Sequence, residues 1–112
     1  MSRYGTTPRA QRDLIEHYAY IARDKIAPAD RFLKVADQTF QRIADMPRAG
    51  RVWESTNSKM SGIRVYPMPS PYRSYLVFYR IADPETVSIL AVLHGARNID
   101  ALLDDIIGLP DQ

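Results

Sequence analysis

The sequence predicts an α+β domain in which an N-terminal antiparallel helical hairpin packs on a small antiparallel β-sheet and a short C-terminal helix closes the chain. Apolar residues recur with a helical period up to about residue 46 and with a period of two beyond residue 51. The later segments follow one another through tight turns, as antiparallel strands do. The chain has 112 residues, so we expect one domain over residues 1–112.

The first helix is predicted over residues 8–24. The Thr7 hydroxyl can accept a hydrogen bond from an amide of the first turn, and Pro8 suits the first helical position. One apolar stripe follows at three- and four-residue steps: Ala10, Leu14, Tyr18, Ile21 and Ala22.

A second helix is predicted over residues 28–46, where Pro47 and Gly50 provide the stop. Its expected apolar stripe is Ala29, Phe32, Leu33, Ala36, Phe40, Ile43 and Met46. Two helices that are joined by a short break most simply form an antiparallel hairpin.

Three strands are predicted over residues 63–68, 72–82 and 86–94, where aromatic and β-branched residues dominate. Residues 2–6 can add an edge strand. A closing helix is expected to begin at Asn98, with one apolar side formed by Ile99, Leu102, Leu103 and Ile106.

Both faces of the predicted sheet are partly apolar. In the central strand, Tyr75, Val77, Tyr79 and Ile81 alternate with Leu76 and Phe78. In the next strand, strict alternation places Val87, Ile89, Ala91 and Leu93 opposite Leu90 and Val92. The helical hairpin can cover one face, so the second face is expected to hold a partner chain. The alternative is that the closing helix covers it.

Composition excludes several kinds of site. There are no cysteines and only two histidines, and the five glycines are scattered, so we expect no metal, no cofactor and no catalytic nucleophile. His17 is expected on the surface, and His94 at a strand end. The longest apolar run, residues 89–93, is too short to span a membrane. No signal peptide is recognised, and a soluble cytoplasmic protein is expected.

Charge is unevenly distributed along the chain. Residues 47–82 carry six basic residues against one acidic residue, whereas residues 83–112 carry one basic residue against six acidic residues. Because twelve of the fifteen basic residues are Arg, the middle of the chain suits carboxylates or phosphates, unless it is simply a solvated basic face.

Basic and aromatic residues on the strands permit two functions. They are Arg64, Tyr66, Arg73, Tyr79, Arg80, His94 and Arg97. A metal-free ribonuclease would use Arg for transition-state charge and Tyr or His for proton transfer. A protein-binding surface uses the same residue types, so residue type alone does not separate the two.

Four segments of the chain resemble the ParE branch of the RelE/ParE toxin superfamily: TPRAQRDLIEHYAYIA, ADRFLKVADQTFQRIADMPRAGR, YRSYLVFYRIAD and ILAVLHGARNIDALL. The most specific pieces are MPRAGR, FYR and VLHGAR. The resemblance extends from about Thr7 to Leu103, although residues 52–62 do not match. It implies a helical hairpin on a small antiparallel sheet.

The resemblance also implies the toxin of a type II toxin–antitoxin pair. ParE members are described as inhibitors of DNA gyrase, whereas RelE members cleave messenger RNA on the ribosome. The tail after Arg97 is acidic and lacks Tyr, His, Lys and Arg, which favours the ParE branch because a nuclease must approach phosphates. A RelE-type ribonuclease and an inactive antitoxin-binding relative are the alternatives.

The implied partners are a ParD-like antitoxin and DNA gyrase, in a hetero-oligomer and without a membrane or sequence-specific DNA contact. Antitoxins of this kind are acidic chains whose C-terminal segment folds on the toxin. Seven residues are expected to bind antitoxin or target, because Arg and aromatic side chains are the usual anchors of interfaces: Arg64, Tyr66, Arg73, Tyr75, Arg80, His94 and Arg97.

Overall fold

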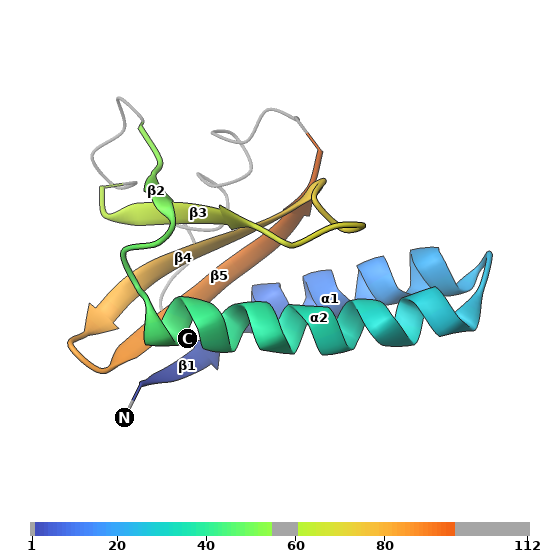
Figure 1. Ribbon diagram of the computed structural model, residues 1–112, viewed down its shortest axis with the longest axis horizontal. Helices are drawn as coiled ribbons and strands as arrows, with labels where there is room; N and C mark the ends of the chain where they lie inside the picture. Colours follow the sequence, from blue (N-terminus) through green and yellow to red (C-terminus); the bar gives the residue numbers. More distant parts are fainter. Residues whose placement is uncertain (1, 55–60, 96–112) are drawn as a thin grey trace.

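The computed structural model describes residues 2–54 and 61–95. Their elements, in chain order, are β1 (Arg3–Thr6), α1 (Pro8–Ala22), α2 (Ile26–Asp45), β2 (Arg51–Val52), β3 (Ile63–Pro67), β4 (Tyr75–Asp83) and β5 (Thr86–His94). The two helices lie side by side on one face of a five-stranded sheet, and their connected ends extend beyond it (Figure 1).

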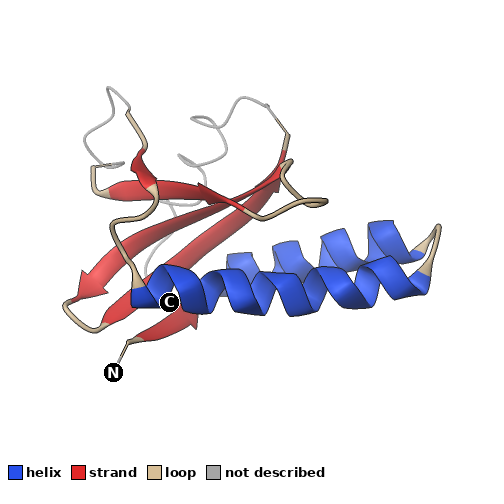
Figure 2. Ribbon diagram, viewed as in Figure 1, coloured by secondary structure: helices blue, strands red, loops and turns tan. Residues whose placement is uncertain are grey.

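The sheet is mixed, with the strand order β1-β5-β4-β3-β2. The three predicted strands pair in antiparallel fashion, as expected, and Arg3–Thr6 forms the expected edge strand. The prediction of a wholly antiparallel sheet is wrong, because β1 pairs with β5 in parallel (Figure 2). A parallel pair needs a long crossover connection, and both helices lie in the chain between β1 and β5.

Both helices are confirmed to within two residues at each end. The Thr7 hydroxyl accepts from the Ala10 amide at 3.1 Å, and Pro8 opens α1 as predicted. The apolar stripe of α2 is corrected at two positions, since Leu33 and Met46 are exposed. Thr39 is buried instead, where its hydroxyl donates to the Val35 carbonyl at 2.7 Å and so needs no partner outside the helix.

The main core lies between the helices and the sheet. Aromatic rings fill much of it: Phe32 packs against Tyr72 and Tyr75, with ring centroids 5.5 and 4.8 Å away. The buried aliphatic side chains from the sheet in this layer are Val77, Val87, Ile89 and Val92. The apolar stripes of both helices are buried in this layer.

The alternation predicted for β5 is interrupted by a β-bulge. Phe78 pairs with Ala91 but Tyr79 pairs with Ile89, so Leu90 is an extra residue. The extra residue moves Val92 to the helix-covered face and moves Ala91 and Leu93 to the opposite face. The predicted grouping of Ala91 and Leu93 with Val87 and Ile89 is therefore wrong.

The second face of the sheet is not bare. Five of its apolar side chains are at most 6% exposed: Ile63, Val65, Phe78, Ala91 and Leu93. Trp53, Leu76 and Leu90 pack against them and are half-buried. The Trp53 ring packs edge-on against Phe78, with ring centroids 5.6 Å apart. The expected open apolar surface for a partner chain is therefore wrong for these residues. The predicted closing helix, from Asn98 onward, lies outside the described residues.

Where β5 extends beyond β1, its backbone forms hydrogen bonds with side chains of α1 and of the N-cap residue Thr7. The Thr7 hydroxyl donates to the Leu90 carbonyl at 3.0 Å. A carboxylate oxygen of Asp13 accepts from the Val92 amide at 3.0 Å, and His17 Nε2 donates to the Val92 carbonyl at 2.7 Å. These groups replace a neighbouring strand, because buried backbone polar groups need partners. The expectation that His17 is a plain surface residue is wrong.

Tyr79 joins the segment after α2 to the sheet. Its buried hydroxyl donates to the Pro47 carbonyl at 2.6 Å and accepts from the Gly50 amide at 2.9 Å. Arg64 Nη1 donates to the Gly50 carbonyl at 2.7 Å. Two of the motifs that are distinctive in the sequence, residues 46–51 and 78–80, are thus one structural unit.

Burial raises the pKa of the Asp13 carboxyl, although the Val92 amide, the Arg9 guanidinium and His17 lower it in part. The Asp13 carboxyl therefore binds its proton more tightly in the folded protein than in the unfolded chain. This tighter binding stabilises the folded protein at low pH, and the stabilisation is lost as the pH rises above 3.8. We expect the free energy of unfolding of the wild type to fall with rising pH relative to that of Asp13→Asn. Urea unfolding of both proteins between pH 4 and pH 7 measures this. The prediction is contradicted if the free energy of unfolding of the wild type minus that of Asp13→Asn stays constant or increases with pH.

Gly50 is required by the closeness of Tyr79. A Cβ atom at Gly50 would lie 2.7 Å from Tyr79 Cε1 and 2.9 Å from Cζ. The buried ring has no space to retreat, so we expect Gly50→Ala to reduce the free energy of unfolding by about 1–3 kcal/mol. Gly5→Ala is the matched control, since nothing lies within 4 Å of its added carbon. Equal stability of the two variants in thermal unfolding would disprove the close-packing argument.

Candidate binding groove

A groove of about 980 Å³ lies between the second half of α2 and the edge of the sheet at β3. Residues of α2 line it on one side, and residues of β3 and of the turn that follows line it on the other. The described residues that line it are Gln38, Thr39, Arg42, Ala49, Arg51, Val65, Tyr66, Pro67, Met68, Pro69, Ser70 and Arg73. We call it the basic groove.

Three arginines from three different elements border the basic groove: Arg42 from α2, Arg51 from β2 and Arg73 from the turn between β3 and β4. Arg42 Nε donates to the Tyr66 hydroxyl at 3.0 Å. The Arg51 guanidinium carbon lies 5.5 Å from the centre of the Trp53 ring. These contacts orient two of the three guanidinium groups.

The groove is electrostatically one-sided. Its described lining contains no Asp or Glu. In residues 2–54 and 61–95, no carboxylate lies within ion-pair distance of Arg42, Arg51 or Arg73, whereas Arg9 is paired with Asp13 at 2.9 Å. Guanidinium groups bind carboxylates and phosphates in a bidentate manner. The groove is therefore suited to an anionic ligand.

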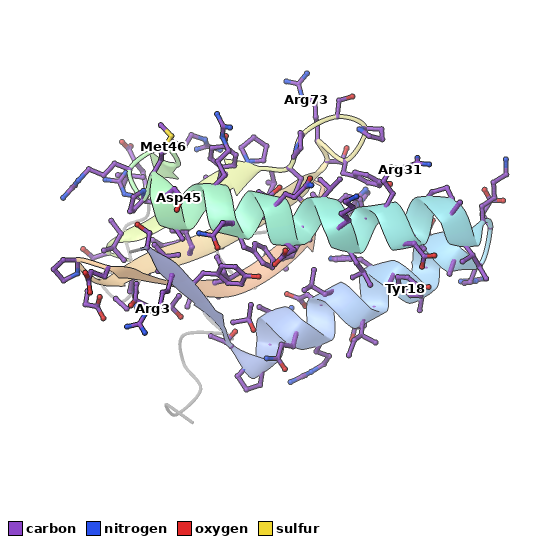
Figure 3. The ribbon with its side chains drawn as sticks, turned by 60° about the horizontal axis from the view of Figure 1, so that its bottom comes forward. Arg3, Tyr18, Arg31, Asp45, Met46 and Arg73 are labelled. Atoms are coloured by element: carbon purple, nitrogen blue, oxygen red, sulfur yellow. The ribbon has the colours of Figure 1, made fainter. Side chains whose placement is uncertain are left out.

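Two of the seven predicted site residues, Tyr66 and Arg73, line this groove. Arg73 projects into solvent from its turn (Figure 3). Arg64 lies next to them in the sheet, but its guanidinium is bonded to the Gly50 carbonyl and holds the segment after α2. Of these three residues, Tyr66 and Arg73 therefore share the surface of the groove.

The remaining predicted residues lie elsewhere. Arg80 pairs with Ile63 on the opposite face of the sheet, and its Nη2 donates to the Ser61 carbonyl at 3.3 Å. Tyr75 is buried, and its ring lies between the rings of His17 and His94 at 4.9 and 4.6 Å.

Burial raises the pKa of Tyr75, to which Tyr20 and Tyr72 add, so its hydroxyl stays protonated at neutral pH. His94 is exposed at the end of β5, and Arg97 lies outside the described residues.

Sequence reasoning missed Arg42 and Arg51 as groove residues. Arg42 is on the polar side of a predicted helix, where any charged residue is expected. Arg51 was counted in the basic middle of the chain, but the two-residue strand that positions it has no recognisable pattern. The pairing of β2 with β3 places Arg51 on the groove that Arg42 and Arg73 also line.

The described residues contain no group of three His, Asp or Glu side chains placed to hold a metal ion. In the same part of the chain, none of the helices is both long enough and apolar enough to cross a membrane.

Comparisons with known proteins agree with this architecture. A solved structure described as a chromosomal ParDE toxin–antitoxin system from P. aeruginosa matches with a TM-score of 0.64 at 16% sequence identity, over 86% of this chain and 97% of that chain. At this identity the match shows the fold. No curated protein matches the sequence.

A family model gives the assignment. The model of the ParE toxin of type II toxin–antitoxin systems, parDE, matches residues 4–99, which is most of the chain. The matched region contains both helices, the strands β2 to β5, all of β1 except Arg3, and the basic groove. The chain therefore belongs to the ParE toxin family of type II toxin–antitoxin systems.

Proposed function

We propose that this protein is a toxin that inhibits DNA gyrase by binding, without catalysing a reaction, and that a ParD-like antitoxin neutralises it in a hetero-oligomeric complex. Family membership supports the toxin role. Gyrase acts on bacterial DNA, so the proposed place of action is the cytoplasm. The observation that carries the non-enzymatic part is the dispersal of the side chains that a ribonuclease would need.

A metal-free ribonuclease needs a cation and proton-transfer groups around one phosphate. Here Arg64 and Tyr66 lie on the helix-covered face, whereas Arg80 lies on the opposite face. His94 is at the end of β5 and pairs with Tyr75. The candidate catalytic residues that the structure describes therefore do not surround one point.

Two of these side chains are also engaged in holding the fold. The Tyr79 hydroxyl is buried, and both its hydrogen bonds go to the backbone of residues 47–50. Its pKa is raised by burial, which further opposes a role as a proton acceptor. The Arg64 guanidinium is bound to the Gly50 carbonyl. A structural role for both supports a binding protein over a ribonuclease.

Purified toxin is expected to block supercoiling of relaxed plasmid by gyrase or to accumulate cleaved DNA, and a stoichiometric amount of antitoxin is expected to reverse the effect. Agarose-gel assays of the plasmid forms measure both. The control is a gyrase reaction with heat-unfolded toxin. Unchanged supercoiling at saturating folded toxin would remove gyrase as the target.

The ribonuclease and the inactive relative make different predictions. In cells that stop growing after induction of the toxin, we expect messenger RNA to remain full-length on northern blots. Rapid cleavage of messenger RNA within ribosome-bound regions would support the RelE-type activity instead. Continued growth at a high toxin level would support an inactive antitoxin-binding relative.

A further inference from the structure

We propose that the outer face of the helical hairpin is a contact between two copies of this chain, which associate as a reversible two-fold dimer. This face lies where α1 and α2 meet on the side away from the core. We call it the hairpin face, and its apolar residues are Ile15, Ala19, Ala22, Ile26 and Leu33. The proposal goes beyond the proposed function, because gyrase inhibition does not require it.

A hydrogen bond between the helices defines the register of the hairpin face. The Tyr18 hydroxyl donates to the Asp30 carboxylate at 2.8 Å, so these two residues lie at the same level of the hairpin. Ile15 is three residues before Tyr18, and Leu33 is three residues after Asp30. Steps of three or four residues keep side chains on one side of a helix. Because the helices are antiparallel, Ile15 and Leu33 therefore lie side by side.

The hairpin face is apolar and exposed. Ile15 is 68% exposed and Leu33 is 41% exposed. Four residues from the Tyr18–Asp30 pair, toward the connection, the next level contains Ala22 and Ile26, and Ile26 is 64% exposed. Half of the large apolar side chains that are exposed in residues 2–54 and 61–95 thus lie on this face. The connected ends of the helices extend beyond the sheet, which leaves room for a second molecule (Figure 1).

The hairpin face is separate from the basic groove. Arg42 follows Leu33 by nine residues, which is about two and a half turns of α2. The two side chains therefore leave α2 in opposite directions, and Arg42 lines the groove. A molecule bound at one surface leaves the other accessible.

A second copy of the chain fits the hairpin face because the face is complementary to itself. In a two-fold dimer each contact occurs twice, so the same patch must supply both sides of the interface. Two hairpins can pack face to face about an axis parallel to their helices. Each α1 then lies on the α2 of the other copy at the same level, and all neighbouring helices are antiparallel, as in a four-helix bundle. Ile15 of each copy then contacts Leu33 of the second copy.

Charged residues beside the apolar centre pair in the same arrangement. Glu16 and Lys34 each follow a residue of the central apolar pair by one position, so they are offset by about 3 Å along the axis. Arg12 and Asp37, on the other side of the centre, are offset by about 1.5 Å. Each charge on α1 therefore lies opposite the other sign on α2 of the second copy. Within residues 2–54 and 61–95, Arg12, Glu16 and Lys34 are exposed and form no ion pair in their own chain.

The size of the hairpin face predicts a weak dimer. It covers about three turns of each helix. Interfaces that bury less than about 1,200 Å² in total belong to transient complexes. Exposed ion pairs at the rim set the orientation of the two copies, and salt screens them. The dimer is therefore expected to dissociate on dilution, and more readily at high salt.

Sedimentation equilibrium of toxin purified without antitoxin tests the dimer. Between 5 and 300 µM, in 50 mM NaCl, we expect the average mass to rise from 12.8 kDa toward twice that value. Ile15→Glu places a charge at the apolar centre, and we expect it to weaken the dimer at least tenfold. Tyr20→Glu is the matched control, because Tyr20 is 69% exposed on the same helix but about 140° around it. We expect this control to stay within twofold of wild type.

An exchange of charges tests the register. Glu16→Lys alone, or Lys34→Glu alone, places like charges opposite each other, and we expect each to weaken the dimer severalfold in 50 mM NaCl. The double variant restores opposite charges and is expected within twofold of wild type. In 300 mM NaCl the differences should shrink, because salt screens exposed charges. Weakening by the double variant that equals the two single effects together would disprove the pairing. Thermal unfolding checks that every variant is folded.

The remaining outcomes also decide the proposal. A wild type that keeps the monomer mass at 300 µM overturns it, as does equal dimerisation of Ile15→Glu and Tyr20→Glu. If Ile15→Glu leaves the mass unchanged but abolishes gyrase inhibition or antitoxin binding, the hairpin face belongs to that partner and the dimer proposal fails. The plasmid assays test the toxin function separately, since a monomeric toxin can still inhibit gyrase.

Discussion

The buried hydroxyl of Tyr79 connects the two halves of this fold. It accepts a hydrogen bond from the Gly50 amide and donates one to the Pro47 carbonyl. Because Tyr79 is at the centre of β4, the chain that leaves α2 must pass directly over this part of the strand. That position starts β2 beside β3 and places Ala49 and Arg51 at the sheet edge. Without this contact the segment would lose its backbone partners, and the basic groove would lose one wall.

A second constraint sets the other edge of the sheet. β1 is only four residues long, so the backbone of Val92 extends beyond it. Asp13 and His17 bind this backbone from α1, which fixes the helix layer relative to β5. The carboxylate of Asp13 is desolvated to make this contact, and its raised pKa reflects that desolvation. The two edges of the sheet therefore differ. Side chains of α1 bind the backbone at the β5 edge, whereas the β3 edge borders the groove.

The function proposed here depends on this asymmetry. The apolar second face of the sheet, which the sequence indicated as a partner surface, is buried at Ile63, Phe78 and Ala91. The unpaired charge lies instead at the opposite edge, between α2 and β3. Binding by side chains in such a groove needs no rearrangement of the sheet, and it suits a partner that becomes ordered as it binds.

The sequence by itself determined the helices, the three long strands, the N-cap at Thr7 and the family, because these follow from local periodicity, capping and motif order. Tertiary structure alone decided the parallel pairing of β1, the bulge at Leu90, the hydrogen bond of His17 to Val92, and the groove that Arg42 and Arg51 line together with Arg73. These depend on contacts between residues far apart in the chain. A one-residue bulge reverses which face a side chain occupies, and no local pattern records it.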